Sequence, residues 1–538
     1  MKKRTVAISI ALASVLAVSP AVLSGCSGDH YTEIKFAKQD TSYVVTSQGG
    51  SAVSYGNYVY FINGTRGFDD TNGNANVWDE VVKGALYRAE LSGEKVVDEY
   101  DGLTRFKTSP DENGLEFKYD ASTDYFDNPL NVVKTTKIAP KTIGTASYTR
   151  GGIFIYDNAV YFASPNNEKD KNGTVQTSRT DFFMMPLSGG EPTKIYTTSE
   201  KVDTTASAYA FYKYKGAVYL VVNEGAKVIS VKVNPSKQDV SDPVTLISNV
   251  TSVYFPVRDT YYKGISNNTP EDFIYIVRNV KDGELQRSGT VIEAMRPNGS
   301  ENFVVSMNGQ TESIEAVRDG MVFYRTTVVS DTVMAYTNLH NMLMEYSPSY
   351  KKEQEALNED ERTRQIDGTF TKSMLAGSIS ISATYAFRGD LLSNTVYCVG
   401  VASSAMYLYR NDALVGRISP MTGTIQFIQN DYLYFSDSSN NYYRVPLYSN
   451  MEGYNPDSSA DVEIVASDTS SATSGIKCDY AAGYFVYFDE VDEWANNYTY
   501  FYKVDGARME PQFVGKLAKS DIPTKEQIEE KIKGSSSN

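Results

Sequence analysis

The feature that most constrains the fold of this chain is a short apolar motif that recurs eight times along its 538 residues. Each copy has an aliphatic residue, then Tyr or Phe, then a third apolar or aromatic residue. The copies are Val59–Phe61, Val160–Phe162, Val218–Leu220, Ile274–Ile276, Val322–Tyr324, Val396–Cys398, Leu433–Phe435 and Val486–Phe488. Runs of this length and composition are typical of β-strands, so each copy predicts one strand.

The turns repeat along with the strands. Six copies follow a dipeptide that suits a tight hairpin turn: Gly56-Asn57, Asp157-Asn158, Lys215-Gly216, Asp319-Gly320, Asn430-Asp431 and Ala482-Gly483. Gly, Asn and Asp adopt the positive φ angles that such turns require. A second set of Gly turns follows the next strand, at Ser92-Gly93, Ser188-Gly189, Asn298-Gly299 and Asp505-Gly506. The copy around Tyr434 reads as four successive strands, Ile425–Gln429, Tyr432–Ser436, Tyr442–Leu447 and Val462–Ala466.

A four-stranded meander that recurs about every 50 to 60 residues cannot bury both of its faces alone, and radial closure is the usual all-β solution. We therefore predict an all-β fold, a β-propeller of four-stranded antiparallel blades over residues 51–517. Eight copies predict eight blades. The spacing between Tyr397 and Tyr434 is only 37 residues, so seven blades is the alternative. The 41 Tyr residues suit stacked sheets, because the ring packs while the hydroxyl finds a polar partner.

The N-terminus predicts where in the cell the protein is located. Lys2-Lys3-Arg4 precedes the apolar segment Val6–Val18, which is shorter than a typical transmembrane helix. This order of a basic and an apolar segment is typical of a signal peptide, here over residues 1–25. Leu23-Ser24-Gly25-Cys26 resembles the lipobox of bacterial lipoproteins, in which the cysteine receives a diacylglycerol. We expect lipidation at Cys26, a tether over residues 26–50, and a protein held on the outer surface of the cell membrane by acyl chains such as palmitate.

The remaining segments interrupt or flank the repeat. Tyr43–Thr46 is expected to add a strand to the last blade and close the ring, and residues 518–538 to form a short helix and a polar tail. The insertion Phe106–Thr145 is expected to be mostly loop. The insertion Tyr350–Ile366 has the composition of a charged helix, and such insertions on a propeller rim are where binding specificity tends to reside.

One loop offers hard oxygen ligands. Asp69, Asp70, Asn72 and Asn74, followed by Asp79 and Glu80, have the near-alternating spacing that calcium favours. The loop lacks Gly at the sharp-turn position of a calcium loop. A calcium site is therefore one interpretation, and a plain polar hairpin loop is the other. No other cofactor is expected.

Few other residues suggest chemistry. The two histidines, His30 and His340, are expected in the tether and in a loop or strand, so no paired-histidine mechanism is predicted. Cys398 and Cys478 lie in strands of different copies and form either a disulfide or two buried free thiols. The acidic run from Asp489 to Glu493 is expected to be a solvated loop. No catalytic residue is assigned.

The charge restricts the partners. The formal net charge of -15 argues against nucleic-acid binding, which needs basic stripes that displace counterions from phosphate. The expected partners are the membrane, through the lipid anchor, and an unidentified protein, peptide or glycan.

The repeat also resembles a known family. The stretches "NYVYF…GALYRAELSGE", "NAVYF…TDFFMMPLSGG" and "DYLYFSDSSNNYYRVPL" are similar to propellers of the DUF5050 type, which resemble low-density-lipoprotein-receptor propellers and occur in surface lipoproteins of Gram-positive anaerobes. Tyr434-Phe435-Ser436-Asp437 is similar to the YWTD signature of receptor propellers. The resemblance covers roughly residues 51 to 517. It implies an extracellular propeller with a binding function and attaches no catalytic residue.

Three functions follow as hypotheses. The first is a non-catalytic binding or scaffolding lipoprotein. The second is a surface enzyme that acts on polysaccharide with carboxylates in the propeller funnel. The third is a structural component of the envelope.

Overall fold

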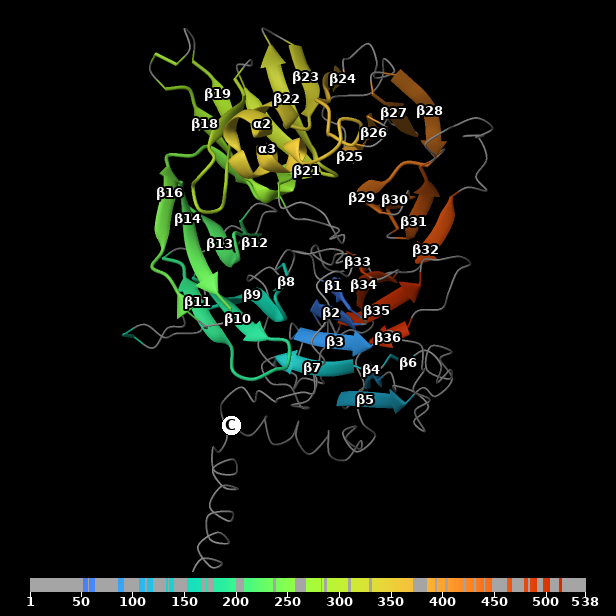
Figure 1. Cartoon of the computed structure of the whole chain (residues 1–538). Coiled ribbons are helices and arrows are strands. Elements are labelled where there is room, and N and C mark those ends of the chain that lie inside the picture. The colour runs from blue at the N-terminus through green and yellow to red at the C-terminus, as the bar shows by residue number, and fades with distance from the viewer. Residues whose placement is uncertain are drawn as a thin grey trace, which may run out of the picture.

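Eight antiparallel sheets stand around a common axis in the computed structural model of the chain (Figure 1). The structure describes strand segments within residues 52–139, most of residues 152–370, and strand and turn segments within residues 385–514. Each sheet is a four-stranded meander, and two of the sheets carry a fifth strand. All eight apolar motifs form the second strand of a separate sheet, so the predicted eight-bladed β-propeller is confirmed.

The first four blades contain the following strands. Blade 1 has β1 (Ala52–Tyr55), β2 (Tyr58–Ile62), β3 (Leu86–Glu90) and β7 (Thr135–Ala139); blade 2 has β8 (Phe154–Tyr156), β9 (Ala159–Pro165), β10 (Thr180–Pro186) and β11 (Thr193–Thr197). Blade 3 has β12 (Tyr209–Tyr214), β13 (Ala217–Glu224) and β14 (Lys227–Asn234), with β15 (Asp239–Val240) and β16 (Val244–Ser248) both paired to β14. Blade 4 has β17 (Ser252–Tyr254), β18 (Ile274–Asn279), β19 (Thr290–Met295) and β20 (Phe303–Ser306).

The other four blades continue in chain order. Blade 5 has β21 (Glu312–Arg318), β22 (Met321–Val328), β23 (Asp331–Thr337) and β24 (Asp367–Phe370); blade 6 has β25 (Tyr385–Asp390), β26 (Thr395–Val401), β27 (Met406–Arg410) and β28 (Ala413–Ser419). Blade 7 has β29 (Thr424–Gln429), β30 (Tyr432–Ser436), β31 (Tyr442–Pro446) and β32 (Glu463–Ala466). Blade 8 has β33 (Asp479–Ala481), β34 (Tyr484–Glu490), β35 (Asn497–Lys503) and β36 (Gln512–Val514).

The turns have the predicted backbone. Asp157 and Asn158 both have positive φ, as do Lys215 with Gly216 and Asp319 with Gly320, which matches the primed hairpin turn. Gly189 and Gly299, predicted after the third strand, also have positive φ. The predicted turns at 430–431 and 482–483 lie outside the described residues.

The hydrophobic cores lie between blades. Phe211 of blade 3 packs against Phe154 and Tyr161 of blade 2, with ring centroids 5.4 and 5.2 Å apart. Phe323 of blade 5 stacks on Phe387 of blade 6 at 4.6 Å. Each of the core clusters described, from blade 1 round to blade 7, joins neighbouring blades in this way. A blade therefore buries its two faces only by packing against its neighbours, as the repeat predicts.

The ring closes where the first blade meets the last. β1 contacts β33, and the short strand β6 (Val132–Val133), which lies between β3 and β7 in the chain, pairs in parallel with β36 of blade 8. A segment inserted in blade 1 thus extends the sheet of blade 8. The strand expected at Tyr43–Thr46 lies outside the described residues.

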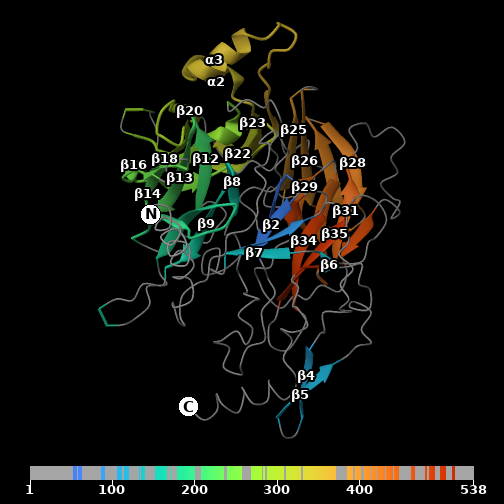
Figure 2. The same cartoon turned by 60° about the horizontal axis from the view of Figure 1, so that its bottom comes forward.

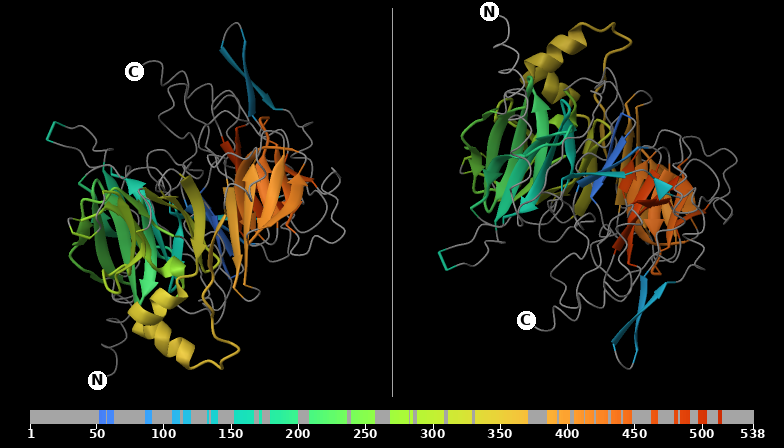
Figure 3. Two further views of the ribbon diagram at one scale, coloured as in Figure 1. Left: turned by 90° about the horizontal axis from the view of Figure 1, so that it is seen from above. Right: turned by 90° about the horizontal axis from the view of Figure 1, so that it is seen from below.

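Two insertions differ from the expectation. The Phe106–Thr145 insertion, expected to be mostly loop, contains the hairpin β4 (Phe106–Asp111) and β5 (Gly114–Tyr119), then β6 and the fourth strand of blade 1. Helix α2 (His340–Tyr346) precedes the expected helical segment, and α3 (Pro348–Glu355) covers only its start. Figures 2 and 3 show α2 and α3 beyond one face of the ring and the β4–β5 hairpin beyond the other. Within the described residues, no helix has the length and apolar character needed to cross a lipid bilayer.

Candidate binding face

The turns between first and second strands gather on one face of the ring, which we call the turn face. Asp157, in this turn of blade 2, forms an ion pair with Lys213 at the end of the first strand of blade 3. Glu271, in the corresponding connection of blade 4, accepts a hydrogen bond from the amide of Gly320 in blade 5 at 2.6 Å. Because strands alternate in direction within a blade, the connections between third and fourth strands lie on the same face.

The helical insertion of residues 338–366 occupies this face. It connects the third and fourth strands of blade 5, and helix α2 contacts β20 of blade 4. Leu339, Leu343 and Tyr350 are buried in one cluster with Phe273 and Phe303. The insertion of blade 5 therefore covers the core of the preceding blade and stabilises both blades.

Polar side chains close the base of the insertion. Asn338 donates to the carbonyl of Arg364 at 2.6 Å and accepts from the amide of Ile366 at 3.1 Å, which joins the two ends of the insertion. His340 is the first residue of α2 and not the predicted loop or strand residue. Its Nδ1 lies 2.8 Å from the hydroxyl of Tyr350, and burial lowers the pKa of the imidazole. His340 thus has a neutral, structural role between α2 and α3.

A buried arginine fixes the insertion to blade 4. Arg296 has no exposed surface, and its guanidinium stacks over the ring of Phe273 at 3.8 Å. Its Nε donates to Glu301 at 2.7 Å, and its Nη2 donates to Asn268 at 2.8 Å and to Ser347, between α2 and α3, at 3.2 Å. Burial alone would raise the pKa of Glu301, but the hydrogen bond and charge of Arg296 outweigh it and hold that pKa below its ordinary value. The pair is therefore ionised in the folded protein.

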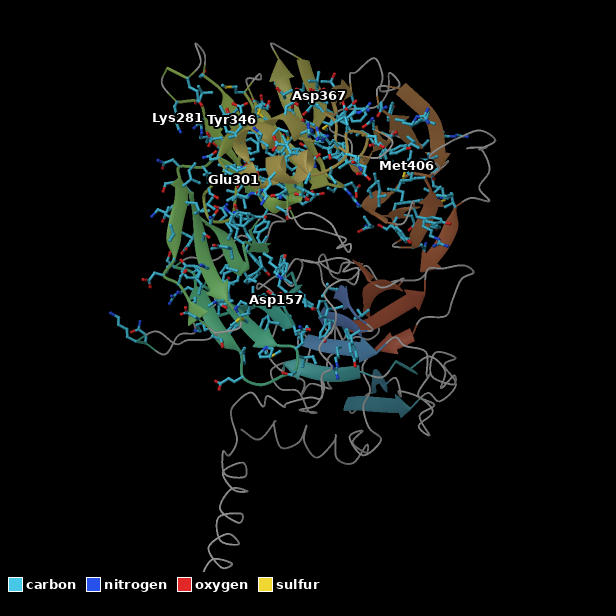
Figure 4. All side chains as sticks on the ribbon, in the orientation of Figure 1. Asp157, Lys281, Glu301, Tyr346, Asp367 and Met406 are labelled. Atoms are coloured by element: carbon cyan, nitrogen blue, oxygen red, sulfur yellow. The ribbon has the colours of Figure 1, made fainter. Side chains whose placement is uncertain are left out.

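Asn268, which also binds Arg296, makes further contacts with the insertion. Asn268 donates to Glu353 of α3 at 2.8 Å and accepts from Ser349 at 2.9 Å. Tyr214 of blade 3 donates to Glu301 at 3.3 Å. The insertion, which begins in blade 5, is held through this network to blades 3 and 4. Figure 4 labels Glu301 and Tyr346 in this part of the ring and Asp157 on blade 2.

The outer side of the insertion is solvent-exposed. The side chains there are of mixed charge and include Glu345, Lys351, Lys352, Glu355, Glu359, Asp360, Glu361 and Arg362. Tyr346, at the end of α2, is 43% exposed and stacks on Phe303 at 5.7 Å. The outer side of the insertion thus presents one exposed aromatic ring among charged side chains of both signs.

The YWTD-like motif has a structural role in blade 7. Tyr434 is buried in the second strand, and Asp437 ends the motif in the following turn. The Asp437 carboxylate accepts from the amides of Ser439 at 2.8 Å and Asn441 at 2.9 Å, and from the hydroxyl of Tyr443 at 3.0 Å. Burial opposes its ionisation, but these hydrogen bonds prevail and lower the pKa of Asp437. The acid closes the hairpin between β30 and β31.

The remaining predicted residues are distributed as follows. Cys26 and the calcium candidates Asp69, Asp70, Asn72 and Asn74 lie outside the described residues, and so does Cys478. Cys398 is a buried free thiol, and burial raises its pKa. Asp489 and Glu490 end strand β34 and do not belong to a loop. Among the described side chains, no group of three or more His, Cys, Asp or Glu residues is arranged to hold a metal ion.

Comparison with known proteins gives similarity in structure only. No model of a known protein family matches the chain, and no curated protein sequence matches it. The β-propeller domain of the Trilobed protease from Pyrococcus furiosus is 8% identical, with 75% of this chain and 94% of that chain covered and a TM-score of 0.33. The Dos1 propeller is 9% identical, with 88% and 97% covered and a TM-score of 0.37. Apo AztD from Citrobacter koseri is 7% identical, with 71% and 91% covered and a TM-score of 0.33.

The propeller fold rests on the strand pairing itself. There are eight successive meanders, and in each the apolar motif forms the second strand. This arrangement agrees with the fold that the DUF5050 resemblance implies.

Proposed function

We propose that this chain is a lipid-anchored, extracytoplasmic β-propeller that acts as a non-catalytic binding or scaffolding module for a protein, peptide or glycan. The observation that carries the proposal is the helical insertion. Its base is held by the buried Arg296 network, while its outer side exposes Tyr346 and charged groups to solvent. A surface that is ordered before binding loses little conformational entropy when a partner arrives.

Several buried carboxylates of the blades have structural partners, which favours a binding role for this fold. Arg278 is held by Glu284 at 2.7 Å and Glu293 at 2.5 Å. Asp181 accepts from Asn166 at 3.0 Å and lies 3.3 Å from Lys194. These carboxylates are engaged in contacts that stabilise the blades.

The anchor is a separate part of the proposal and rests on the lipobox-like Leu23-Ser24-Gly25-Cys26. Two acyl chains suffice for stable membrane attachment, because each buried methylene contributes about 0.8 kcal/mol. The wild-type chain should stay in the membrane fraction and incorporate labelled fatty acid. Cys26→Ala should block lipidation and leave the propeller folded. An unlabelled wild-type protein in the medium would contradict the anchor.

The binding surface can be tested by photo-crosslinking in cells. A photoreactive residue replaces the exposed Lys352 on α3, and a matched protein carries it at the exposed Lys227. Lys227 begins the third strand of blade 3 and so lies on the opposite face. We expect discrete crosslinked products from position 352 and none of the same products from position 227. Equal labelling at both positions, or none at 352, would refute the assignment of this face.

A further inference from the structure

The outermost strands of the blades differ in how regularly they pair. Over the described residues, the pairing of the third strand with the outer strand shifts register in blades 1, 2, 3, 4, 6 and 7. The pairing is regular in blade 5, between β23 and β24, and in blade 8, between β35 and β36. A bulge twists an outer edge and hinders its pairing with another strand. Most outer edges of this ring therefore carry a protective irregularity, and two do not.

One of the two regular edges already binds an additional strand. β36 of blade 8 pairs in parallel with β6, Phe513 with Val132 and Val514 with Val133. β24 of blade 5 pairs with β23 alone among the described strands. The molecule thus shows that a regular outer edge accepts a further strand, and β24 is the second edge of this kind.

The hydrogen-bond pattern shows which backbone groups of β24 face outward. The amide of Asn338 donates to the carbonyl of Ile366 at 3.0 Å, so these two residues occupy a bonded position of the ladder. Bonded and non-bonded pairs alternate along antiparallel strands. Gly368, two residues after Ile366, is therefore bonded to β23. Asp367 and Thr369, on either side of it, direct their N–H and C=O groups away from β23.

The side chains of β24 leave this edge accessible. Asp367, labelled in Figure 4, and Thr369 are both exposed. A Cβ on Gly368 would lie 2.4 Å from the hydroxyl oxygen of Tyr336, so the tyrosine requires a glycine at this position. A glycine within a strand often marks a place where another backbone approaches closely. The centre of β24 therefore presents no side chain that would obstruct a second strand.

The edge is complementary to itself. An antiparallel pair of two β24 strands, centred on Gly368, places Asp367 of each copy opposite Thr369 of the other. Both residues direct their backbone groups outward, so each of these pairs exchanges both of its N–H···O bonds. A carboxylate then faces a hydroxyl, which avoids the like charges that destabilise a sheet when they lie directly opposite. A twofold axis between the two glycines relates the copies, as in most homodimers.

We propose that β24 is a self-association edge, through which two copies of this chain join their fifth blades into one antiparallel sheet. Because the paired strands run in opposite directions, the two helical insertions lie on opposite faces of the pair and do not obstruct each other. The inference is independent of the proposed binding function, which uses the outer side of the insertion. The two can therefore fail separately.

Disulfide trapping tests the register of this pair. Two forms of the purified full-length chain, Asp367→Cys and Thr369→Cys, carry different affinity tags and are oxidised separately and as a mixture. In the mixture the new cysteines lie opposite each other with Cα atoms about 5.5 Å apart, which suits a disulfide. Identical positions are diagonal neighbours about 7 to 8 Å apart, beyond the usual reach of a disulfide. We expect covalent dimers that carry both tags, and few or none from either form alone or from the wild type.

A proline tests the contribution of the main chain. Thr369→Pro, added to the Asp367→Cys form, removes an outward N–H and leaves the bonds to β23 in place, so trapping with the Thr369→Cys form should be lost. Thr369→Val at the same position keeps the N–H and should preserve trapping. If the proline lowers the melting temperature, the comparison of mixed and separate forms decides the question.

The outcomes divide clearly. No dimer from the mixed forms, or dimers formed equally by mixed and separate forms, overturns the proposal. Trapping that survives a folded proline variant also overturns it. If no dimer forms and a photoreactive residue at position 367 crosslinks in cells to a different protein, the edge belongs to that partner and self-association is refuted.

Discussion

Arg296 and Glu301 form an ion pair with 2.7 Å between Nε and Oε2, and the arginine side chain has no exposed surface. In a buried ion pair each charge stabilises the other, because the loss of one partner leaves the remaining charge buried without compensation. The pair lies under the helical insertion, where the guanidinium also holds Ser347. It therefore couples the stability of blade 4 to the position of the proposed binding face.

This coupling predicts a non-additive pair of substitutions. Arg296→Met should lower the free energy of unfolding by about 3 to 5 kcal/mol, since it leaves the Glu301 carboxylate buried and unpaired. Arg296→Met combined with Glu301→Leu should recover most of that loss, because an apolar pair needs no compensating charge. Urea unfolding of the wild type, both single variants and the double variant measures the effect. A double variant as unstable as the sum of the singles would contradict it.

Acid should weaken blade 4 through Glu284. Two hydrogen bonds from Arg278 hold the pKa of this carboxyl at about 2, below its ordinary value of 4.5. A group whose folded pKa is lowered contributes stability above its unfolded pKa and loses it as the pH falls through the folded value. Glu284→Gln should therefore reduce the fall in stability between pH 4.5 and about 2. Identical pH profiles of unfolding for the two proteins would rule out this contribution.

The YWTD-like turn should depend on its acid. Asp437→Ala removes the acceptor of the hydrogen bonds from Ser439, Asn441 and Tyr443, and should cost about 1 to 3 kcal/mol. Ser438→Ala, an exposed change in the same turn, should cost less than about 0.5 kcal/mol. Thermal unfolding compares the two. Equal effects of the two variants would show that the carboxylate does not hold the turn.

Ring closure should respond to proline in β6. Val133→Pro removes a main-chain donor from the segment that pairs with β36, where Val133 lies opposite Val514. Amide hydrogen exchange should then accelerate at residues 512–514 of blade 8 and remain unchanged in blade 4. No local acceleration would show that β6 does not secure the boundary between the first and last blades.

The regular part of this fold was predictable from the sequence, because each blade repeats a local pattern. The central residues Tyr60, Tyr161, Tyr275 and Tyr434 are fully or almost fully buried, as a packing motif requires. The turns followed from residues that tolerate positive φ. Both signals involve neighbours in the chain, so one sequence suffices to find them.

The candidate sites were not predictable in the same way. Arg296 meets Ser347 only because an insertion of blade 5 folds over blade 4, and β6 meets β36 across most of the chain. The one local signal was an arginine directly after the buried strand β19, in "EAMRPNG", which a buried ion pair explains. The bulge at Glu315, where the pairing of β21 with β22 shifts, leaves no local signal either, since a shift of pairing depends on the partner strand.

The central claim is that this propeller binds a ligand without converting it. The most direct test measures binding and turnover of the same oligosaccharides. The purified chain is titrated with maltohexaose, cellohexaose and chitohexaose, and each mixture is then analysed by mass spectrometry after prolonged incubation. We predict saturable heat with at least one oligosaccharide and no change in its mass. Cleaved products, absent from a control without protein, would contradict the claim and favour a surface enzyme that acts on polysaccharide.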